Sequence, residues 1–304
     1  YVKIQRNQPD IIMTPDQYCQ QKAVASGSSF YASFRFLPEL QRRAITALYA
    51  FCREVDDVVD ECSEPQLALQ TLNWWRGEVA SLYQRKGTHP VTLALQALLD
   101  DFNLAEEYLL EIIDGMEMDL HQHSYADFTA LSLYCYRVAS VVGLLSVEIF
   151  GYRNRNTLKY AHDLGMAFQL TNILRDVRED AERGRCYIPQ DELQKFGISQ
   201  QDLTQPVTSD AVQQLFAFQA ERARDFYRKA LSQLPEEDRY NQRAGLIMAE
   251  IYQSLLDEIE EDQYRVLEHR IKLTPLRKIW LAWRAARREK KRRREYLKQQ
   301  QRRS

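Results

Sequence analysis

The sequence lacks three features that would each assign it to a different class of protein. Its five cysteines form neither a CxxC motif nor a zinc-ligand spacing, which favours a reduced cytosolic protein. We find no stretch that approaches the roughly 20 apolar residues of a transmembrane helix, and no signal peptide is visible. No alternating pattern is long enough to build a β-sheet, so we expect an all-α fold.

Charge is nearly balanced overall but unevenly distributed. The 304 residues carry a formal net charge of −2, and 45% of them are hydrophobic, as in a soluble globular protein with a substantial core. Between Arg277 and Arg303 the local charge is +11, which leaves about −13 for the rest of the chain. We therefore divide the chain into an N-terminal extension (1–13), one domain (14–275) and a basic amphipathic tail (276–304). Met13 is a more natural start than Tyr1, so residues 1–12 are interpreted as an upstream extension.

Two acidic clusters dominate the sequence. Asp56 and Asp60 lie four residues apart in a segment with helical apolar periodicity, and Asp176 and Asp180 repeat this spacing in another. This spacing places each pair on one helix face, where like charges repel. Mg²⁺ would relieve the repulsion, because it prefers oxygen ligands and commonly bridges carboxylates to substrate phosphates. The clusters predict a helical enzyme that ionises diphosphates in an apolar cavity.

Each acidic pair continues a polar stripe along its helix. The stripes comprise Tyr49, Arg53, Asp56 and Asp60 in the first helix, and Gln169, Asn172, Arg175, Asp176 and Asp180 in the second. An arginine on such a face can pair bidentately with diphosphate oxygens. A solvated face with an ordinary Arg–Asp pair is the alternative for the first stripe, but its apolar neighbours Val58 and Val59 favour burial.

Two other segments leave alternatives open. The loop formed by Ser26, Gly27, Ser28 and Ser29 could hold phosphate oxygens through its N–H groups and hydroxyls, but an ordinary helix connector is the more common use of such residues. The small-residue run 138–143 lies in an expected helix over 127–150. It fits either a long apolar ligand lying against the backbone or tight helix packing.

Periodicity and capping residues predict the other helices. We expect them over 14–25, from Pro38 onward, as two or three helices within 65–110, and over 108–121, 157–180, 209–233 and 240–269. Residues 190–208 are polar, and we expect a loop there.

The chain becomes both apolar and basic after Pro275. Ile279, Trp280 and Trp283 can share a helix face surrounded by Lys and Arg, which suits an anionic membrane surface. A nucleic acid is the obvious rival partner for a basic run, but no nucleic-acid motif accompanies it, so none is expected. Beyond residue 288 a solvated, frayed tail is an equal expectation. We expect a cytoplasmic protein, peripheral on the inner face of the membrane.

Residues 49–60 and 169–187 resemble the two aspartate-rich motifs of the squalene and phytoene synthase family. They read YAFCREVDDVVD and QLTNILRDVRED, the latter continuing to Arg185, Cys186 and Tyr187. A lone DDxxD motif is less specific, because chain-elongating prenyl diphosphate synthases also use it, and the NILRDVxED context separates the two. The resemblance covers residues 14–283. Within the family the chain is most similar to bacterial presqualene diphosphate synthases, on residues 111–120 and 273–283, with bacterial phytoene synthases close behind.

The resemblance implies a single-domain isoprenoid-synthase-type helical bundle around a central apolar cavity, with residues 14–275 as the catalytic domain. It implies Mg²⁺-dependent condensation of two farnesyl diphosphates, head to head, to presqualene diphosphate with release of diphosphate, in hopanoid or squalene biosynthesis. Mn²⁺ is an alternative metal. No counterpart of the reducing, membrane-spanning part of eukaryotic squalene synthases is visible, so NADPH is not expected. Downstream isoprenoid enzymes are candidate partners.

Two other functions stay open at this point. One is a phytoene synthase, which would condense two geranylgeranyl diphosphates for carotenoid biosynthesis. The other is a non-catalytic helical membrane adaptor, which only the basic tail supports.

The resemblance also implies roles for individual residues. Metal ligands would be Asp56, Asp60, Asn172, Asp176 and Asp180. Substrate contacts would come from Ser26, Gly27, Ser28, Ser29, Tyr49, Arg53, Gln169, Arg175 and Tyr252. Tyr134 would lie near the developing carbocation and is a candidate for proton handling. The catalytic set is then Asp56, Asp60, Asp176, Asp180, Tyr134 and Arg53.

Overall fold

The computed structural model describes residues 13–26, 33–62 and 64–302, and these ranges contain helices and loops but no β-strand. The elements are α1 (Pro15–Ala25), α3 (Glu39–Glu61), α4 (Pro65–Tyr83), α5 (Pro90–Gln96), α6 (Glu106–His121), α7 (Phe128–Cys135), α8 (Val141–Phe150), α9 (Asn156–Glu182), α10 (Gln190–Lys195), α11 (Asp210–Gln233), α12 (Glu236–Arg239), α13 (Arg243–Glu261) and α14 (Pro275–Gln301). A π-helical segment, Tyr136–Ser140, joins α7 to α8. The all-α prediction is confirmed.

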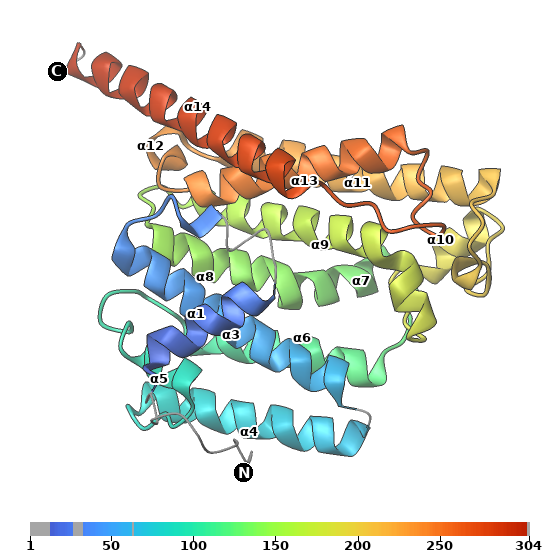
Figure 1. Ribbon diagram of the computed structural model, residues 1–304, viewed down its shortest axis with the longest axis horizontal. Coiled ribbons are helices and arrows are strands. Elements are labelled where there is room, and N and C mark those ends of the chain that lie inside the picture. The colour runs from blue at the N-terminus through green and yellow to red at the C-terminus, as the bar shows by residue number, and fades with distance from the viewer. Residues whose placement is uncertain (1–12, 27–32, 63, 303–304) are drawn as a thin grey trace.

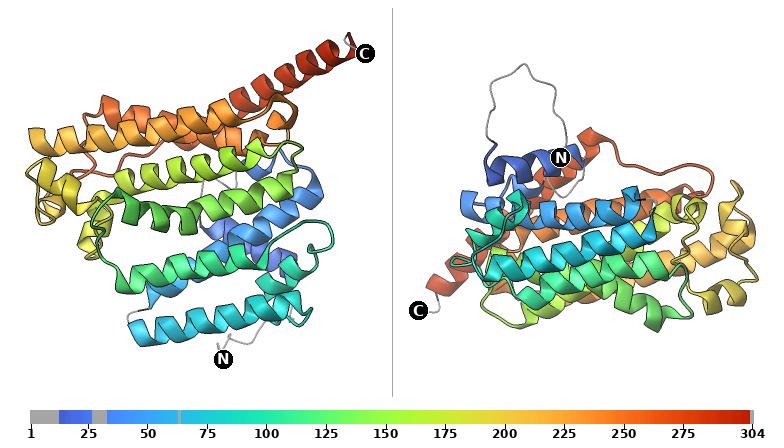
Figure 2. Two further views of the ribbon diagram at one scale, coloured as in Figure 1. Left: turned by 180° about the vertical axis from the view of Figure 1, so that it is seen from behind. Right: turned by 90° about the horizontal axis from the view of Figure 1, so that it is seen from below.

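The long helices stack in layers across the molecule (Figures 1 and 2). The stack runs from α4 at one end, through α3 and α6, to α8 and α9, and then to α11, α13 and α14 at the other end. Helix α8 lies between two hydrophobic clusters. Its Leu144 and Val147 belong to the cluster around α9 and α11, whereas Leu145 and Ile149 belong to the cluster around α3 and α6.

The central position of α8 explains a departure from the sequence-based expectation. The continuous segment Phe128–Phe150 is long and apolar enough to cross a membrane, with a mean hydropathy of 1.6, although we expected no such stretch. It packs against α6 and α9 in the middle of the bundle. A helix with neighbours on opposite faces needs apolar side chains nearly all round. Burial in the core therefore accounts for its composition.

Helices α8 and α9 approach each other closely where both carry glycine. A Cβ atom on Gly143 would lie 2.6 Å from the carbonyl oxygen of Ala161, and one on Gly165 would lie 2.6 Å from the Cα of Ser140. Residues Val138, Ala139, Val142 and Gly143 also line a cavity. The small-residue run therefore serves tight helix packing and forms a cavity wall as well.

Several expected boundaries were wrong. The helix expected over 240–269 is shorter, because α13 begins at Arg243 and ends at Glu261, and the backbone of Gln263 and Tyr264 adopts positive φ, at 58° and 59°, just past its end. The loop expected over 190–208 contains α10 and a short 3₁₀ helix, Asp202–Thr204. The tail does not fray beyond residue 288, because α14 continues to Gln301.

Helix α14 packs against α13 for about half of its length, and its far end projects beyond the bundle (Figure 1). Its buried side chains are Leu281, Ala282, Ala285 and Glu289. The acid Glu289 pairs with Arg239 at 2.8 Å, which offsets the cost of burying its charge. The division of the chain at residues 275 and 276 stays a prediction.

Candidate active site

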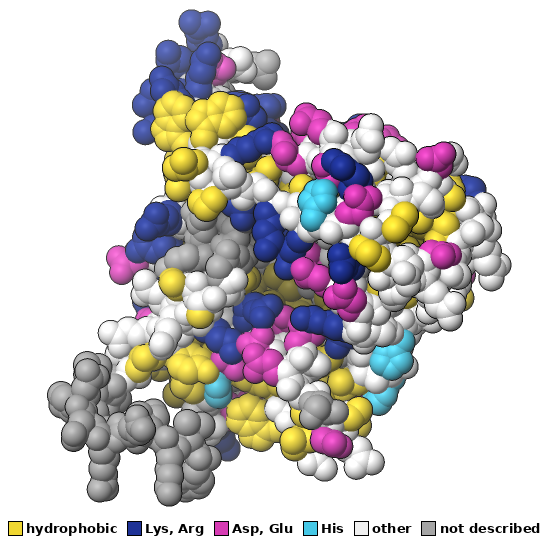
Figure 3. Space-filling model, turned by 45° about the vertical axis from the view of Figure 1, so that its right-hand side comes forward, with side chains coloured by type: hydrophobic (Ala, Val, Ile, Leu, Met, Phe, Trp, Pro, Cys, Tyr) yellow, Lys and Arg dark blue, Asp and Glu magenta, His cyan; other side chains and the backbone are white. Residues whose placement is uncertain are grey.

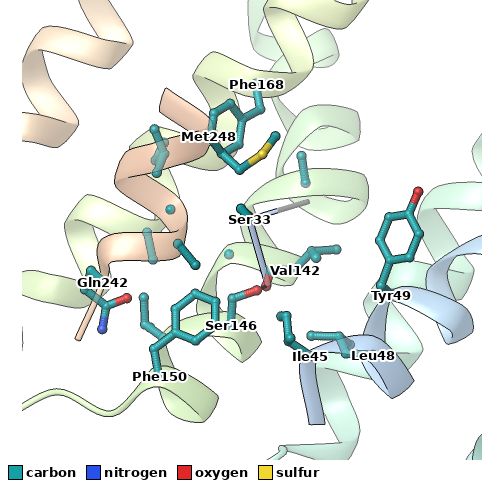
Figure 4. Close-up of a pocket in the computed structure, with 18 of the residues that line it drawn as sticks. Ser33, Ile45, Leu48, Tyr49, Val142, Ser146, Phe150, Phe168, Gln242 and Met248 are labelled. Atoms are coloured by element: carbon teal, nitrogen blue, oxygen red, sulfur yellow. Dashed lines mark hydrogen bonds between the residues drawn. The ribbon is translucent and has the colours of Figure 1, made fainter. Parts of the chain in front are cut away.

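A polar mouth opens over an apolar cavity in the middle of the bundle. The cavity has a volume of about 200 Å³. Its wall includes Ile45, Leu48, Val142, Phe150, Phe168 and Met248, contributed by α3, α8, α9 and α13 (Figure 4). The mouth has a volume of about 620 Å³. Figure 3 shows a hollow with a hydrophobic floor between basic and acidic side chains.

Mouth and cavity form one continuous space. Tyr49, Cys52, Val138, Gln169 and Asn172 line both. This arrangement would suit an amphiphilic ligand, because its charged head would contact the polar mouth and its long apolar tail would contact the apolar cavity.

Helix α3 presents the first acidic cluster to the mouth. Arg53 donates to Asp56 and to Asp57, each at 2.5 Å, because three- and four-residue spacing places these side chains together on the helix. Asp60 accepts from Arg183 at 3.2 Å and from Arg185 at 2.9 Å. These two arginines follow the end of α9, so the two acidic helices face each other across the mouth.

Helix α9 presents the second cluster. Asp176 pairs with Arg175, its neighbour in the chain, and with Arg270 at 2.9 Å. Asp180 lies one turn further on. Burial, together with the charges of Asp176 and Asp119, raises the pKa of Asp180 to about 7. A further cation placed beside Asp180 would favour its ionised form.

Two further observations indicate that the site suits a divalent cation. The side-chain oxygen of Asn172 is buried and has no hydrogen-bond partner among the described residues. Burial raises the pKa of Asp56 to about 6 in spite of the neighbouring Arg53, and the charges of Asp60 and Asp57 add to this effect. Carboxylate and amide oxygens are the ligands that Mg²⁺ prefers, and Mn²⁺ shares this preference. The donor set therefore fits the expected metal.

The acids do not already converge as a metal site. Within the part of the chain that the structure describes, no three His, Cys, Asp or Glu side chains are grouped so that they could hold an ion. Asp56, Asp60 and Asp176 each contact arginine instead. Metal binding would require these ion pairs to rearrange.

One buried acid of the site was missed by sequence reasoning. Asp119, on α6, accepts a hydrogen bond from the hydroxyl of Tyr134 at 2.9 Å and another from Tyr187 at 2.7 Å. Burial raises the pKa of Asp119 to about 6, although the hydrogen bond from Tyr187 lowers it. The sequence did carry a signal for this residue. Helical spacing places Asp119 on the same face as the apolar Ile112 and Met116, and an acid on an apolar face is expected to be buried.

Sequence reasoning also missed three cations of the mouth. Arg270, Lys272 and Lys278 line it together with Arg53 and Arg175. Burial lowers the pKa of Lys278, and the nearby Arg175 and Lys272 add to this effect, as expected where positive charges converge. Such a cluster suits an anionic head group. In the sequence, Lys278 belongs to the basic tail. It reaches the mouth only because α14 packs beside it.

The structure brings most of the predicted residues together. The mouth is lined by Ser26, Tyr49, Arg53, Asp56, Tyr134, Gln169, Asn172, Arg175 and Tyr252. Asp60 and Asp176 contact the arginines described above, whereas Asp180 lies beside Arg185 and Tyr187. Gly27, Ser28 and Ser29 lie outside the described residues. The roles assigned to these side chains stay predictions.

The fold and the site define a helical enzyme with a charged mouth over an apolar cavity. The chain belongs to the squalene/phytoene synthase family, whose model matches residues 23–277. It is therefore a prenyltransferase of a family that condenses prenyl diphosphates head to head. The predicted family is confirmed.

Named relatives differ in the product that they make. The chain is 42% identical to the presqualene diphosphate synthase of Rhodopseudomonas palustris over 245 residues, covering 80% of this chain and 87% of the relative. It is 36% identical to the 15-cis-phytoene synthase of Synechococcus elongatus over 276 residues, covering 86% and 89%. A crystal structure of a dehydrosqualene synthase in complex with ligand superposes with a TM-score of 0.80 at 27% identity, covering 94% of this chain and 97% of that one.

Proposed function

We propose that this protein condenses two farnesyl diphosphates head to head to presqualene diphosphate and releases diphosphate. The observation that carries the proposal is the continuity of the polar mouth with the apolar cavity through Tyr49, Gln169 and Asn172. The identity of 42% to a presqualene diphosphate synthase supports the choice of substrate. A hopanoid or squalene pathway would use this product.

The head groups bind at the mouth. Arg53 and Arg175 pair with diphosphate oxygens, and Tyr49, Gln169, Tyr252 and Ser26 complete the polar contacts. Asp56, Asp60, Asn172, Asp176 and Asp180 would hold Mg²⁺, or Mn²⁺ in its place. When bound there, the metal would supply positive charge that favours departure of the diphosphate. Arg270, Lys272 and Lys278 add positive charge to the same mouth.

The cavity protects the reaction from water. Departure of diphosphate leaves an allylic cation, which water would quench, and the walls formed by Leu48, Val142 and Phe168 exclude water and align the second substrate's double bond. Loss of one proton then closes the cyclopropane. Tyr134 can accept that proton on its hydroxyl oxygen as it passes its own hydroxyl hydrogen along the hydrogen bond to the Asp119 carboxylate, where the proton ends.

Phytoene synthesis from two geranylgeranyl diphosphates is the second candidate, favoured by the 36% identity to a phytoene synthase over 276 residues. Product analysis of the purified enzyme with each donor, with and without NADPH, separates the two. We expect presqualene diphosphate from the farnesyl donor and no requirement for NADPH. Phytoene as the main product would overturn the first proposal. The adaptor hypothesis is not carried forward, because the family consists of prenyltransferases.

The acidic clusters provide the first mutational test. Asp56→Ala or Asp176→Ala should abolish Mg²⁺-dependent diphosphate release, because each removes a metal ligand, while circular dichroism shows unchanged helical content. The matched control is Asp100→Ala, which removes an acid whose side chain is 80% exposed and should leave turnover unchanged. Activity like that of the wild type in either cluster variant would refute the assignment.

A further inference from the structure

Helix α14 exposes a row of large apolar side chains. Leu276 is 81% exposed, Ile279 64%, Trp280 51% and Trp283 52%. Their spacing of three and four residues places them on one helix face over two turns. Contiguous exposed apolar side chains of this size mark an interaction surface more often than a solvated one.

Contacts on the other face prevent this row from turning inward. Leu281 and Ala285 are buried against the body of the protein. Arg284 and Arg288 both pair with Glu250 of α13, and Arg292 pairs with Glu236 at 2.5 Å. These contacts hold α14 by one face and leave the apolar row outward.

Positive charge continues the outward face. Arg287, Lys290 and Arg294 follow the apolar row at three- and four-residue steps, and none of them has an ion-pair partner within the described residues. Trp280 lies 4.5 Å from the guanidinium of Arg284, and Trp283 lies 5.2 Å from that of Arg287. Tryptophan beside arginine suits the boundary between lipid head groups and acyl chains.

The apolar row lies close to the mouth of the active site. Lys278, within the first turn of the same helix, lines that mouth. In Figure 3, exposed hydrophobic side chains flanked by basic ones appear on the same face as the hollow. We propose that the row Leu276, Ile279, Trp280 and Trp283, with the cations that follow it, docks on an anionic lipid bilayer and holds the active-site mouth beside it.

Docking would shorten the path of the substrates and the product. A prenyl diphosphate partitions into a bilayer by its tail, since each buried CH₂ contributes favourably. A mouth held at the surface receives this tail with little exposure to water. This gain in turnover rests on the proposed function, whereas binding to the bilayer does not.

Vesicle sedimentation tests the docking. The full chain is mixed with vesicles of phosphatidylcholine alone or with vesicles that also contain roughly 30% phosphatidylglycerol, an anionic lipid that attracts basic segments. Each mixture is prepared at low and at high salt. We expect binding to the anionic vesicles that weakens with salt, because salt screens the attraction. Trp280→Ser with Trp283→Ser should weaken it about tenfold or more, as should Arg287→Glu with Lys290→Glu.

Matched controls separate docking from general effects. Trp74→Ser removes another exposed tryptophan, on α4, and Lys86→Glu with Lys159→Glu makes the same change in net charge elsewhere. Both controls should bind as the wild type does. The proposal is overturned if the wild-type protein does not bind anionic vesicles, or if the Trp280/Trp283 variant binds them as the wild type does. Binding to a short RNA without binding to vesicles overturns it as well.

Turnover in detergent-dispersed substrate distinguishes this proposal from the proposed function. The Trp280/Trp283 variant should retain wild-type turnover in detergent and lose turnover only with substrate in anionic vesicles. Loss of vesicle binding with unchanged turnover on vesicles would refute the role of docking in catalysis. No turnover by the wild type with either donor would refute the enzyme function while leaving the vesicle-binding result intact.

Discussion

At the scale of single residues, Asp119 holds two tyrosine side chains in place, and one of them, Tyr134, lines the mouth. Its two carboxylate oxygens each accept one tyrosine hydroxyl, from Tyr134 and from Tyr187, and the two rings stack with centroids 5.0 Å apart. Burial, with Asp119 nearby, raises the pKa of Tyr134 well above its usual value, so its phenol stays protonated. A proton taken up by this neutral phenol in the proposed reaction would have to pass on to Asp119 through their hydrogen bond.

Replacing Tyr134 tests this arrangement. Tyr134→Phe should lower kcat by about a hundredfold or more, because a positioned proton-transfer group contributes at least that much. The substitution leaves the donor KM nearly unchanged, since the head group binds elsewhere in the mouth. Steady-state kinetics with each donor measure both quantities.

Tyr125 supplies a matched control for that experiment. It stacks on Tyr187 with centroids 6.0 Å apart, and its buried hydroxyl has no hydrogen-bond partner among the described residues. Tyr125→Phe removes the same atom from the same cluster and should leave kcat unchanged. Equal losses in the two variants would show that the aromatic packing matters and the Tyr134 hydroxyl does not.

The same scale shows what sequence could and could not predict about the site. Asp56, Asn172 and Arg175 were identified because helical spacing is a local property, and it places side chains on one face wherever the helix lies. Arg270 and Lys278 were not, because they reach the mouth only through the packing of other elements around it. No spacing in the sequence encodes those approaches.

At the scale of elements, the contact between α8 and α9 sets the width of the cavity. Gly143→Ala places a methyl group against the backbone of Ala161, which has no flexible end to move, so the helices must separate. We expect a loss of about 1 to 3 kcal/mol in the free energy of unfolding, as for other overpacked cores. Urea denaturation measures it.

Gly77, within α4, is the matched control. A Cβ atom there meets nothing within 4 Å, so Gly77→Ala should stabilise the protein by about 0.5 to 1 kcal/mol through helix propensity alone. Stabilisation of both variants would contradict the close approach of α8 and α9.

The connection between α4 and α5 depends on a buried carboxylate. Glu78 accepts hydrogen bonds from the side chains of Thr88 and Thr92 and from the N–H groups of Thr88 and His89. Burial opposes ionisation, but these hydrogen bonds outweigh it and lower the pKa of Glu78 to about 2. Glu78→Gln should therefore cost about 2 kcal/mol at pH 7.

The pH dependence of this cost has a defined sign. Because the pKa is lowered by folding, the stabilisation is present above the unfolded-state value of 4.5 and is lost as pH falls towards 2. The difference in the free energy of unfolding between Glu78→Gln and the wild type should shrink as the pH falls from about 5 to about 3. A gap that stays constant with pH would contradict the ionised carboxylate.

Helix existence was predictable at this scale, but helix ends were not. Apolar periodicity located the long helices correctly because it reflects burial of one face. The end of α13 was placed too late, since Gln263 and Tyr264 adopt positive φ without the glycine that usually signals it. The N–H groups of Gln263 and Tyr264 donate to the carbonyl oxygens of Glu260 and Ile259, each at 2.8 Å, and close this turn.

At the scale of the whole molecule, the stacking of the helices decides how deep the cavity is. Tyr49 lies towards the mouth, and Phe150 and Gln242 lie on the other side of the apolar space (Figure 4). These residues come from α3, α8 and the turn before α13. Because the depth depends on three separate elements, the sequence motifs do not report substrate length.

Phe150 therefore offers the sharpest test of substrate length. Phe150→Leu shortens the side chain at the far side of the cavity and should raise the ratio of kcat/KM for geranylgeranyl over farnesyl diphosphate by about tenfold, the usual effect of a small change in an apolar pocket. Competition between the two donors in one reaction measures this ratio directly.

Phe216→Leu is the matched control for this change. Phe216 is also buried but lies on α11, outside the residues that line the cavity and the mouth. Both variants should lose similar stability, because both remove the same atoms from a packed core. Only the Phe150 variant should change the donor ratio, since only there does the lost volume join the substrate's space. If the two variants had the same ratio of kcat/KM for the two donors, the residue that limits the length of the substrate tail would lie elsewhere in the bundle.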